Sequence, residues 1–210
     1  MKRTAIAVLV AAAGVAVASS TASAPSVSLQ IKPSAIVYGH EVLLRGRAPR
    51  ARAREQITVL ARTCSFTGAV PVKTLRTRTG GAFSFRIGPT LNTTYVVSWR
   101  KQKSRRVAVA VAPDVDVDME AAGRFRVSVS AGGGSSFAKK KVLLQRRAQK
   151  KWRTVGSATL ALVSPPDALT SVSRATVSAH VARGTKLRAV LPPAQARPCY
   201  RSGISSVIER

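Results

Sequence analysis

The sequence predicts an all-β protein made of two successive β-sandwiches. Short segments in which apolar and polar residues alternate recur along the chain, a pattern typical of strands with one buried face. Glycine- and proline-containing turns separate these segments about every 8–12 residues, and no window has the period of an amphipathic helix. The hydrophobic content of 45% is too high for a disordered chain.

Residues 1–24 have the organisation of a secretory signal peptide and are not part of the predicted fold. A short basic region precedes an apolar run of alanine and valine over 5–18, and small residues follow it. The run is shorter than the roughly 20 apolar residues that a spanning helix needs, with a retained anchor as the alternative interpretation. We expect cleavage after Ala22, or else after Ala24, and no membrane span after cleavage.

Residues 25–113 form the first predicted sandwich, which ends in a hairpin at 88–113. Tyr95, Val97 and Trp99 alternate along the first strand of this hairpin, so we expect them to share its buried face. A basic turn leads into a second strand of alternating valines, which a proline closes. The same alternation, bounded by turn residues, predicts earlier strands at 26–31, 36–38, 41–46, 56–61, 70–77 and 82–87.

Residues 114–210 form the second predicted sandwich and repeat this plan. Val115, Val117 and Met119 are expected to share the buried face of its first strand. Each sandwich is large enough to bury a core of its own. The alternation predicts further strands at 124–131, 142–147, 152–157, 159–163, 174–181, 186–191 and 203–208.

A family resemblance rests on glycines before strands and on aromatic and polar residues within them. These residues are Tyr38-Gly39, Gly80, Phe83, Phe85, Pro89, Asn92, Thr93 and Tyr95, then Val142-Leu143-Leu144-Gln145, Trp152, Gly184-Thr185 and Leu187. Together they resemble the tandem immunoglobulin-like or fibronectin III-like modules of exported proteins from high-GC Gram-positive bacteria. The resemblance implies architecture rather than function, because such sandwiches host many unrelated roles. It also implies a tyrosine corner, in which the hydroxyl of Tyr95 binds upstream backbone.

The charge of the chain is strongly positive, with 35 lysines and arginines against 8 acidic residues and a net charge of +27. Such a field attracts anionic polymers without specifying which one. Codon bias of a GC-rich coding sequence is an alternative origin of the many arginines. Nucleic-acid readers usually place aromatic residues among cations, and only Trp152 has such neighbours. We expect Trp152 in the core, so we predict no specific nucleic-acid recognition.

Two predicted loops of the first sandwich are basic. Immunoglobulin topology places both at the end where the N-terminus enters, so we expect their cations to converge on one tip and bind polyanions. The alternative is a pair of solvated loops without a ligand. The loop residues are Arg50, Arg52 and Arg54 in one, and Lys101, Lys103, Arg105 and Arg106 in the other.

Asp114, Asp116 and Asp118 alternate with hydrophobic residues at the start of the second sandwich. A calcium loop needs a glycine turn that lets several oxygens converge, whereas these acids line one face of a strand. We expect them to pair with Arg124 and Arg126 on a neighbouring strand, and calcium bound between the sandwiches is the alternative. We predict no metal, cofactor or catalytic site, because the cysteines and histidines lack ligand spacing and no nucleophile motif is present.

Cys64 and Cys199 form an even pair, which suggests one bridge in an exported protein. In the immunoglobulin topology implied by the resemblance, Cys64 follows the third strand and Cys199 precedes the last one, at sandwich ends that face each other. We therefore predict a disulfide between the sandwiches. Two separate thiols or an intermolecular bridge are the alternatives.

These features predict an exported, monomeric and non-enzymatic structural or adhesive protein, secreted or associated with the cell wall. Its partners would be anionic wall polymers or other extracellular polymers, held by charge. The alternative is an accessory ligand-binding or inhibitor module that uses the loops at the tip of the first sandwich.

Overall fold

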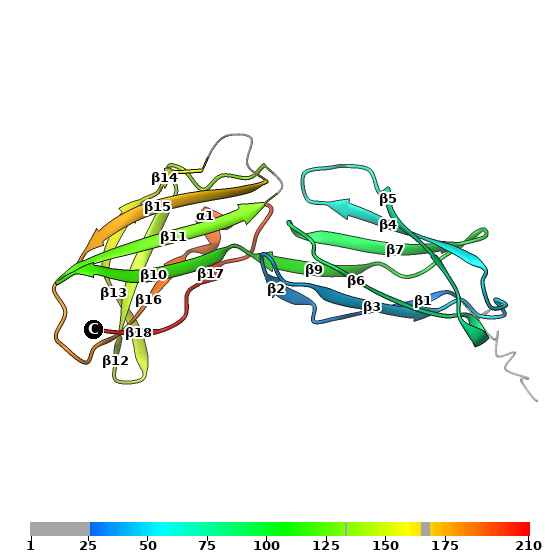
Figure 1. Cartoon of the computed structure of the whole chain (residues 1–210), viewed down its shortest axis with the longest axis horizontal. Coiled ribbons are helices and arrows are strands. Elements are labelled where there is room, and N and C mark those ends of the chain that lie inside the picture. Colours follow the sequence, from blue (N-terminus) through cyan, green and yellow to red (C-terminus); the bar gives the residue numbers. More distant parts are fainter. Residues whose placement is uncertain (1–25, 133, 165–168) are drawn as a thin grey trace, which may run out of the picture.

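The computed structural model describes residues 26–132, 134–164 and 169–210, and the predicted signal peptide at 1–24 lies outside them. The regular structure of the described residues is almost entirely β-strand, which confirms the all-β prediction. Figure 1 shows the strands in two groups that lie end to end. Each β-ladder between described residues joins strands of one group, and we call the groups the first half (26–112) and the second half (114–210).

The first half consists of a three-stranded and a six-stranded sheet. The three-stranded sheet has the order β1-β3-β6, with β1 at Ser28–Lys32, β3 at Val42–Arg47 and β6 at Ala82–Ile87. The six-stranded sheet has the order β2-β9-β7-β4-β5, and β8 pairs with β7. Its strands are β2 (Ala35–Val37), β4 (Gln56–Thr63), β5 (Val70–Arg76), β7 (Thr93–Trp99), β8 (Gln102–Lys103) and β9 (Val107–Ala112). A 3-10 turn, η1 (Thr79–Gly81), leads into β6.

The second half also contains two sheets. One has the order β10-β11-β15-β14, and the other has the order β13-β12-β16-β17 with β18 on β16. The bounds are β10 (Asp114–Ala121), β11 (Arg124–Gly132), β12 (Lys141–Ala148), β13 (Lys151–Thr159), β14 (Ala161–Leu162), β15 (Thr170–Ser178), β16 (Lys186–Leu191), β17 (Gly203–Ile204) and β18 (Ile208–Glu209). A helix of four residues, α1 (Pro193–Ala196), precedes β17 and is too short for a helical period to show in the sequence.

The alternation in the sequence decides which strand faces are buried. In β7 the side chains of Tyr95, Val97 and Trp99 are 1%, 0% and 4% exposed, as predicted. Burial raises the pKa of Tyr95 to about 12. The hydrogen bonds found in the described part of the chain include none from its hydroxyl to upstream backbone, so the expected tyrosine-corner contact is not observed.

Met119 does not lie on the buried face. Its side chain is 51% exposed, although Val115 and Val117 are buried as expected. The pairing of β10 with β11 shifts register between Met119 and Ala121. Met119 itself still pairs with Phe125, but it lies near the end of β10, where every residue from Asp118 to Ala121 is exposed, and the prediction of a buried side chain is wrong.

Candidate functional site

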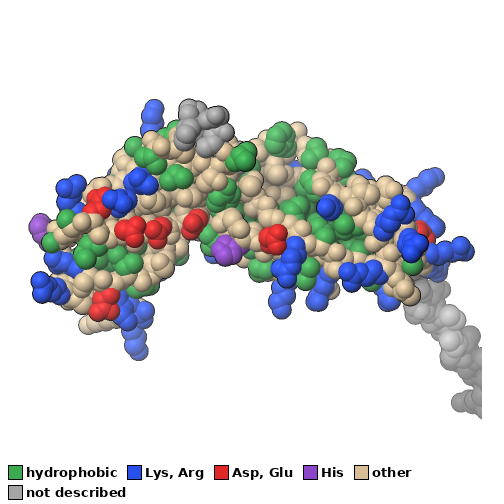
Figure 2. Space-filling view, viewed as in Figure 1, with side chains coloured by type: hydrophobic (Ala, Val, Ile, Leu, Met, Phe, Trp, Pro, Cys, Tyr) green, Lys and Arg blue, Asp and Glu red, His purple; other side chains and the backbone are tan. Residues whose placement is uncertain are grey.

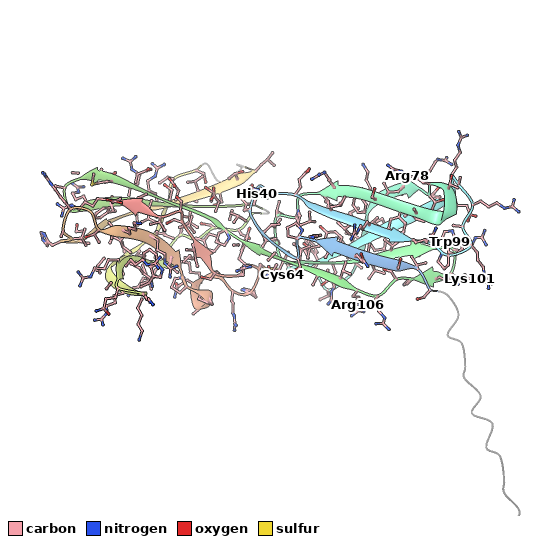
Figure 3. The ribbon with its side chains drawn as sticks, turned by 90° about the horizontal axis from the view of Figure 1, so that it is seen from below. His40, Cys64, Arg78, Trp99, Lys101 and Arg106 are labelled. Carbon is pink, nitrogen blue, oxygen red and sulfur yellow. A yellow bond between two sulfur atoms is a disulfide. The ribbon has the colours of Figure 1, made fainter. Side chains whose placement is uncertain are left out.

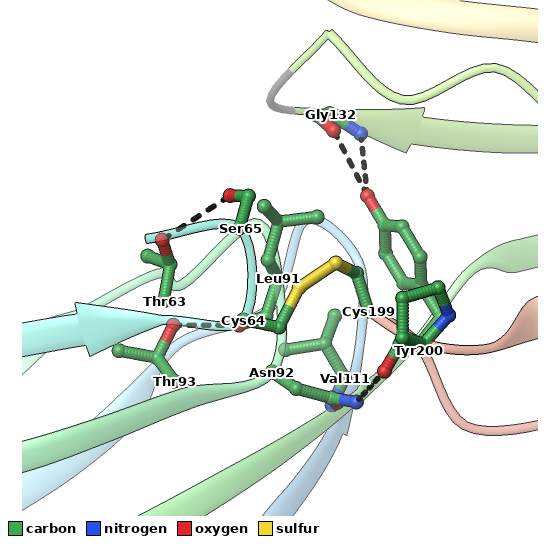
Figure 4. Close-up of a disulfide and its surroundings, with 11 residues drawn as sticks. Thr63, Cys64, Ser65, Leu91, Asn92, Thr93, Val111, Gly132, Cys199 and Tyr200 are labelled. Carbon is green, nitrogen blue, oxygen red and sulfur yellow. Dashed lines mark hydrogen bonds between the residues drawn. A yellow bond between two sulfur atoms is a disulfide. The ribbon is translucent and has the colours of Figure 1, made fainter. Parts of the chain in front are cut away.

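Cys64 and Cys199 form a disulfide between the two halves, as predicted, with 5.3 Å between their Cα atoms. Cys64 directly follows β4, and Cys199 lies between α1 and β17. Figures 3 and 4 show this bond where the two halves meet, a region that we call the junction. The halves are therefore joined covalently at two points, the linker and the disulfide.

Asn92 adds hydrogen bonds beside the disulfide. Its backbone N–H donates to the carbonyl of Cys199 at 2.9 Å, and its own carbonyl accepts the N–H of Cys64 at 3.0 Å. Its side-chain Oδ1 accepts the N–H of Val111 at 2.7 Å. The carbonyl of Val111 in turn accepts the N–H of Arg201 at 2.8 Å. Backbone from both halves is thus paired directly at this point.

Gly132 lies between two tyrosines at the junction. The hydroxyl of Tyr200 donates to the Gly132 carbonyl at 2.9 Å and accepts the Gly132 N–H at 3.2 Å (Figure 4). The Tyr38 ring of the first half approaches so closely that a Cβ on Gly132 would lie 2.5 Å from it. The Tyr38 and Thr170 hydroxyls are hydrogen-bonded across the junction at 2.8 Å. Only glycine at position 132 allows the Tyr38 ring to come this close. Nothing in the sequence pattern indicates this contact.

The opposite end of the first half, which we call the tip, consists of the loop at 48–55 and the turn at 99–102. Figure 3 places Trp99 and Lys101 there, far from Cys64. The Glu55 carboxylate accepts the backbone N–H of Arg52 at 2.7 Å and the indole N–H of Trp99 at 2.9 Å. It also forms an ion pair with Arg100 at 3.0 Å. The Arg52, Trp99 and Arg100 donors lower the pKa of Glu55, so the carboxylate stays ionised and holds the tip together.

Thr77 fixes the tip loop from beneath. Its hydroxyl donates to the carbonyl of Arg52 at 2.6 Å and accepts the N–H of Glu55 at 3.1 Å. The N–H of Arg54 donates to the carbonyl of Thr77 at 2.7 Å. Thr77 is 3% exposed, so these bonds are shielded from water and the loop has a defined shape.

The predicted tip cations Arg50, Arg52, Arg54 and Lys101 all have exposed side chains. The ion pairs among the described residues include none of these four side chains. Arg50 and Arg54 have φ angles of +61° and +67°, in the left-handed region that glycine occupies at lower cost. The tip therefore presents free cations from a backbone that would be less strained with glycine.

The structure places the other predicted cations elsewhere. Lys103 and Arg106 lie on the outer face of the six-stranded sheet, where they line one hollow together with Arg62 of β4. Arg105 is exposed between them, and Figure 3 shows Arg106 well away from Lys101. The predicted single cluster is thus divided between the tip and this sheet face.

The aspartates of β10 form an exposed row on an edge strand, as the alternation predicts (Figure 2). The ion pair of Arg126, however, is with Glu120, and the Arg126 side chain lowers the pKa of that carboxyl. Within the described ranges, the ion pairs include none of Asp114, Asp116 and Asp118. No cluster of three metal-ligating side chains is found in the same ranges.

Trp152 is not in the core, so that expectation is wrong. It is half-buried on an outer face of the second half, where β13 forms the edge of its sheet. The Arg188 guanidinium lies 4.2 Å from the centre of the indole and that of Arg147 lies 5.9 Å away. Arg188 also donates to Gln145 at 3.0 Å. The flanking cations that the sequence shows were the signal for a surface position.

No family model matches this chain, and no curated protein matches it significantly. Among the described residues, no helix is both long and apolar enough to cross a membrane. The function therefore has to be inferred from the residues themselves.

Proposed function

We propose that the chain is an exported, non-enzymatic adhesive protein of two tandem immunoglobulin-like sandwiches, 25–113 and 114–210. It would be held to anionic polymers of the cell envelope by its positive charge, after removal of residues 1–24. The observation that carries this proposal is the tip, where Arg50, Arg52, Arg54 and Lys101 are exposed and form no ion pair with any described residue, while Glu55 is already paired with Arg100.

The left-handed arginines support a role for the charge itself. A glycine at position 50 or 54 would fit the observed backbone at lower conformational cost, so the turn alone does not account for arginine there. Exposed guanidinium groups bind carboxylates and phosphates in a two-pronged geometry. Binding would release counterions from the polymer and would weaken steeply with salt.

The junction supports the adhesive part of the proposal. A disulfide and paired backbone join the halves, so the tip is carried on a connected body rather than on a loose tether. A rigid connection lowers the entropy that is lost when the protein binds an extended polymer.

A tip variant with Arg50, Arg52, Arg54 and Lys101 changed to glutamine tests the proposal. Its control changes Lys139, Lys141, Lys150 and Arg183, four exposed cations of the second half, to glutamine and removes the same charge. We expect the tip variant to leave isolated cell walls and heparin resin at lower salt than the control, with a shallower salt dependence. Equal losses in both variants would show that net charge acts without the tip.

Export is tested separately. N-terminal sequencing of the protein recovered from culture medium or cell wall should begin at Ser23. Recovery of the exported form with Met1 at its start would contradict the predicted cleavage.

A further inference from the structure

The outer face of the six-stranded sheet carries a basic surface of its own. Arg62 of β4 pairs in register with Thr94 of β7, and Thr94 pairs with Ala108 of β9. One register step nearer the tip, Leu60 lies opposite Val96. These side chains share the face of the sheet that points away from the core.

This face is hollow because β9 alternates valine with alanine. Val109 and Val111 are buried in the core, which leaves Ala108 and Ala110 on the outer side. Thr94 of β7 separates Ala108 from the longer side chain of Arg62 on β4, and all three line one depression across these strands. The alternation that builds the core therefore also shapes the outer surface.

Ser104 fixes one rim of the hollow. Its hydroxyl accepts the N–H of Val97 at 2.9 Å and donates to the carbonyl of Arg105 at 2.9 Å. Ser104 is 8% exposed, so this kink between β8 and β9 is firmly held. The kink brings Lys103 and Arg106 to the edge of the sheet face.

Two adjoining hollows of about 250 and 380 Å³ follow this face. They share Arg62, Thr67 and Thr94, so together they form a continuous groove. Volumes of this size approach or reach the range of about 300–1,000 Å³ that is usual for ligand sites. Among the described residues that line the groove, none is an aspartate or a glutamate.

We propose that this groove binds a segment of an anionic polysaccharide, one that carries carboxylate, sulfate or phosphate groups along a sugar chain. The proposal deepens the proposed function, on which it rests for the presence of such polymers outside the cell. Charge complementarity points to an acidic occupant, because Arg62 of β4 and the pair Lys103 and Arg106 reach the groove from two segments of the chain.

The rest of the lining favours a sugar chain over a simple polyanion. Leu60 and Val96 give the groove a half-buried apolar floor, on which the C–H faces of sugar rings can pack. Thr67 and Thr94 supply hydroxyl groups that can donate and accept hydrogen bonds. Phe66 lines the end nearer the junction with a side chain that is 68% exposed. A sugar ring that lies in the groove could pack its C–H face against this ring.

The decisive variant is Ala108→Phe, which places a ring in the larger of the two hollows without changing any charge. Ala108 is exposed on β9, and phenylalanine is well suited to a strand. Ser178→Phe, at an exposed position of β15 in the second half, is the matched control. A second variant changes Arg62, Lys103 and Arg106 to glutamine at exposed positions, so a test remains even if Ala108→Phe does not fold.

The probe is a heparin hexasaccharide, titrated calorimetrically into the full chain at about 0.15 M salt. We expect saturable binding with one hexasaccharide per chain. Both groove variants should weaken binding about tenfold or more, a loss of at least about 1.4 kcal/mol. Ser178→Phe and the variant of four second-half cations should stay within about threefold of the wild type, which is less than 1 kcal/mol.

Several results would overturn the groove. One is a folded Ala108→Phe variant that binds the hexasaccharide with wild-type affinity. Another is a wild-type chain that does not bind the hexasaccharide, while the tip variant still lowers retention on cell walls. The second result would leave the proposed function intact, because it separates the tip from the groove. Polyphosphate or RNA of matched charge that binds as tightly, and competes for the same site, would overturn the assignment to a sugar chain.

Discussion

The two ends of the first half are built in opposite ways. At the junction, a disulfide, paired backbone and two tyrosines connect the halves, and cations are few among these contacts. At the tip, Glu55 and Thr77 hold a loop whose outward side chains are arginines and lysine. The junction is held by contacts inside the molecule, whereas the outward cations of the tip form no ion pair within the part of the chain that the structure describes.

This difference separates stability from binding. Substitutions at the junction should change how the halves are held together and leave polymer binding at the tip intact. Substitutions of the outward tip residues should change binding and alter stability by no more than about 0.5 kcal/mol. The following four experiments test that separation.

Changing both Cys64 and Cys199 to serine should have the largest effect. The cysteines are 135 residues apart, and a loop of that length contributes about 4–5 kcal/mol in the chain-entropy model. We expect the free energy of unfolding in urea to fall by up to that amount, with separate transitions for the two halves. The wild type under reducing conditions serves as the control and should behave alike. Unchanged stability would mean that the other junction contacts suffice.

Changing Gly132 to alanine should disturb the junction less severely. The added Cβ collides with the Tyr38 ring, which can swing away only by breaking its hydrogen bond with Thr170. We expect a loss of about 1–2 kcal/mol in urea unfolding. Tyr38→Phe removes only the hydrogen bond and should cost about 1 kcal/mol. If Gly132→Ala costs no more than Tyr38→Phe, the close approach of the ring is unimportant.

Glu55→Gln should remove a pH-dependent part of the stability of the tip. The pKa of Glu55 is lowered in the folded state, so its contribution is complete above the ordinary value of 4.5 and is lost as the pH falls through the folded pKa. We expect the melting temperatures of wild type and variant to converge on acidification from about pH 6 to about pH 3.

The matched comparison for Glu55 is Glu120→Gln, which removes the same charge from the second half. It should leave the fluorescence of Trp99 unchanged, whereas Glu55→Gln removes the carboxylate that its indole N–H binds. A difference in melting temperature that does not depend on pH would show that Glu55 does not hold the tip through its charge.

Arg54→Gly should have the smallest effect on stability, and the effect should be a gain rather than a loss. The φ angle of +67° suits glycine, so we expect a gain of about 0.5 kcal/mol together with weaker retention on polyanion resin. Arg52 lies outside the left-handed region, so Arg52→Gly should lower stability by a similar amount. It should weaken retention on the resin as much as Arg54→Gly does. A loss of stability in Arg54→Gly would contradict the account of this loop.

Most strands and their buried faces could be predicted from the sequence, because the alternation of apolar and polar residues depends only on neighbours along the chain. Tyr95, Val97 and Trp99 are buried as predicted, and the bridge between Cys64 and Cys199 is confirmed. That bridge was predictable because the topology implied by the resemblance places the two cysteines at sandwich ends that face each other.

The errors arise where three-dimensional context overrides alternation. Met119 lies at the exposed end of β10, and an edge position exposes Trp152. The kink at Ser104 separates Lys103 and Arg106 from the tip, and it depends on hydrogen bonds that the pattern does not reveal. The approach of Tyr38 to Gly132 joins residues far apart in the sequence and has no local signal.

The disulfide also determines how the molecule would respond to mechanical tension. A pull between residues 26 and 210 enters through β1 to β4, crosses the Cys64–Cys199 bond and leaves through β17 and β18. The chain between the cysteines, a separation of 135 residues, carries no tension while the bond is intact. At roughly 3.3–3.6 Å per residue it would otherwise release about 450 Å of extension. The molecule can thus yield only at its two ends, while most strands of both halves are shielded from the force.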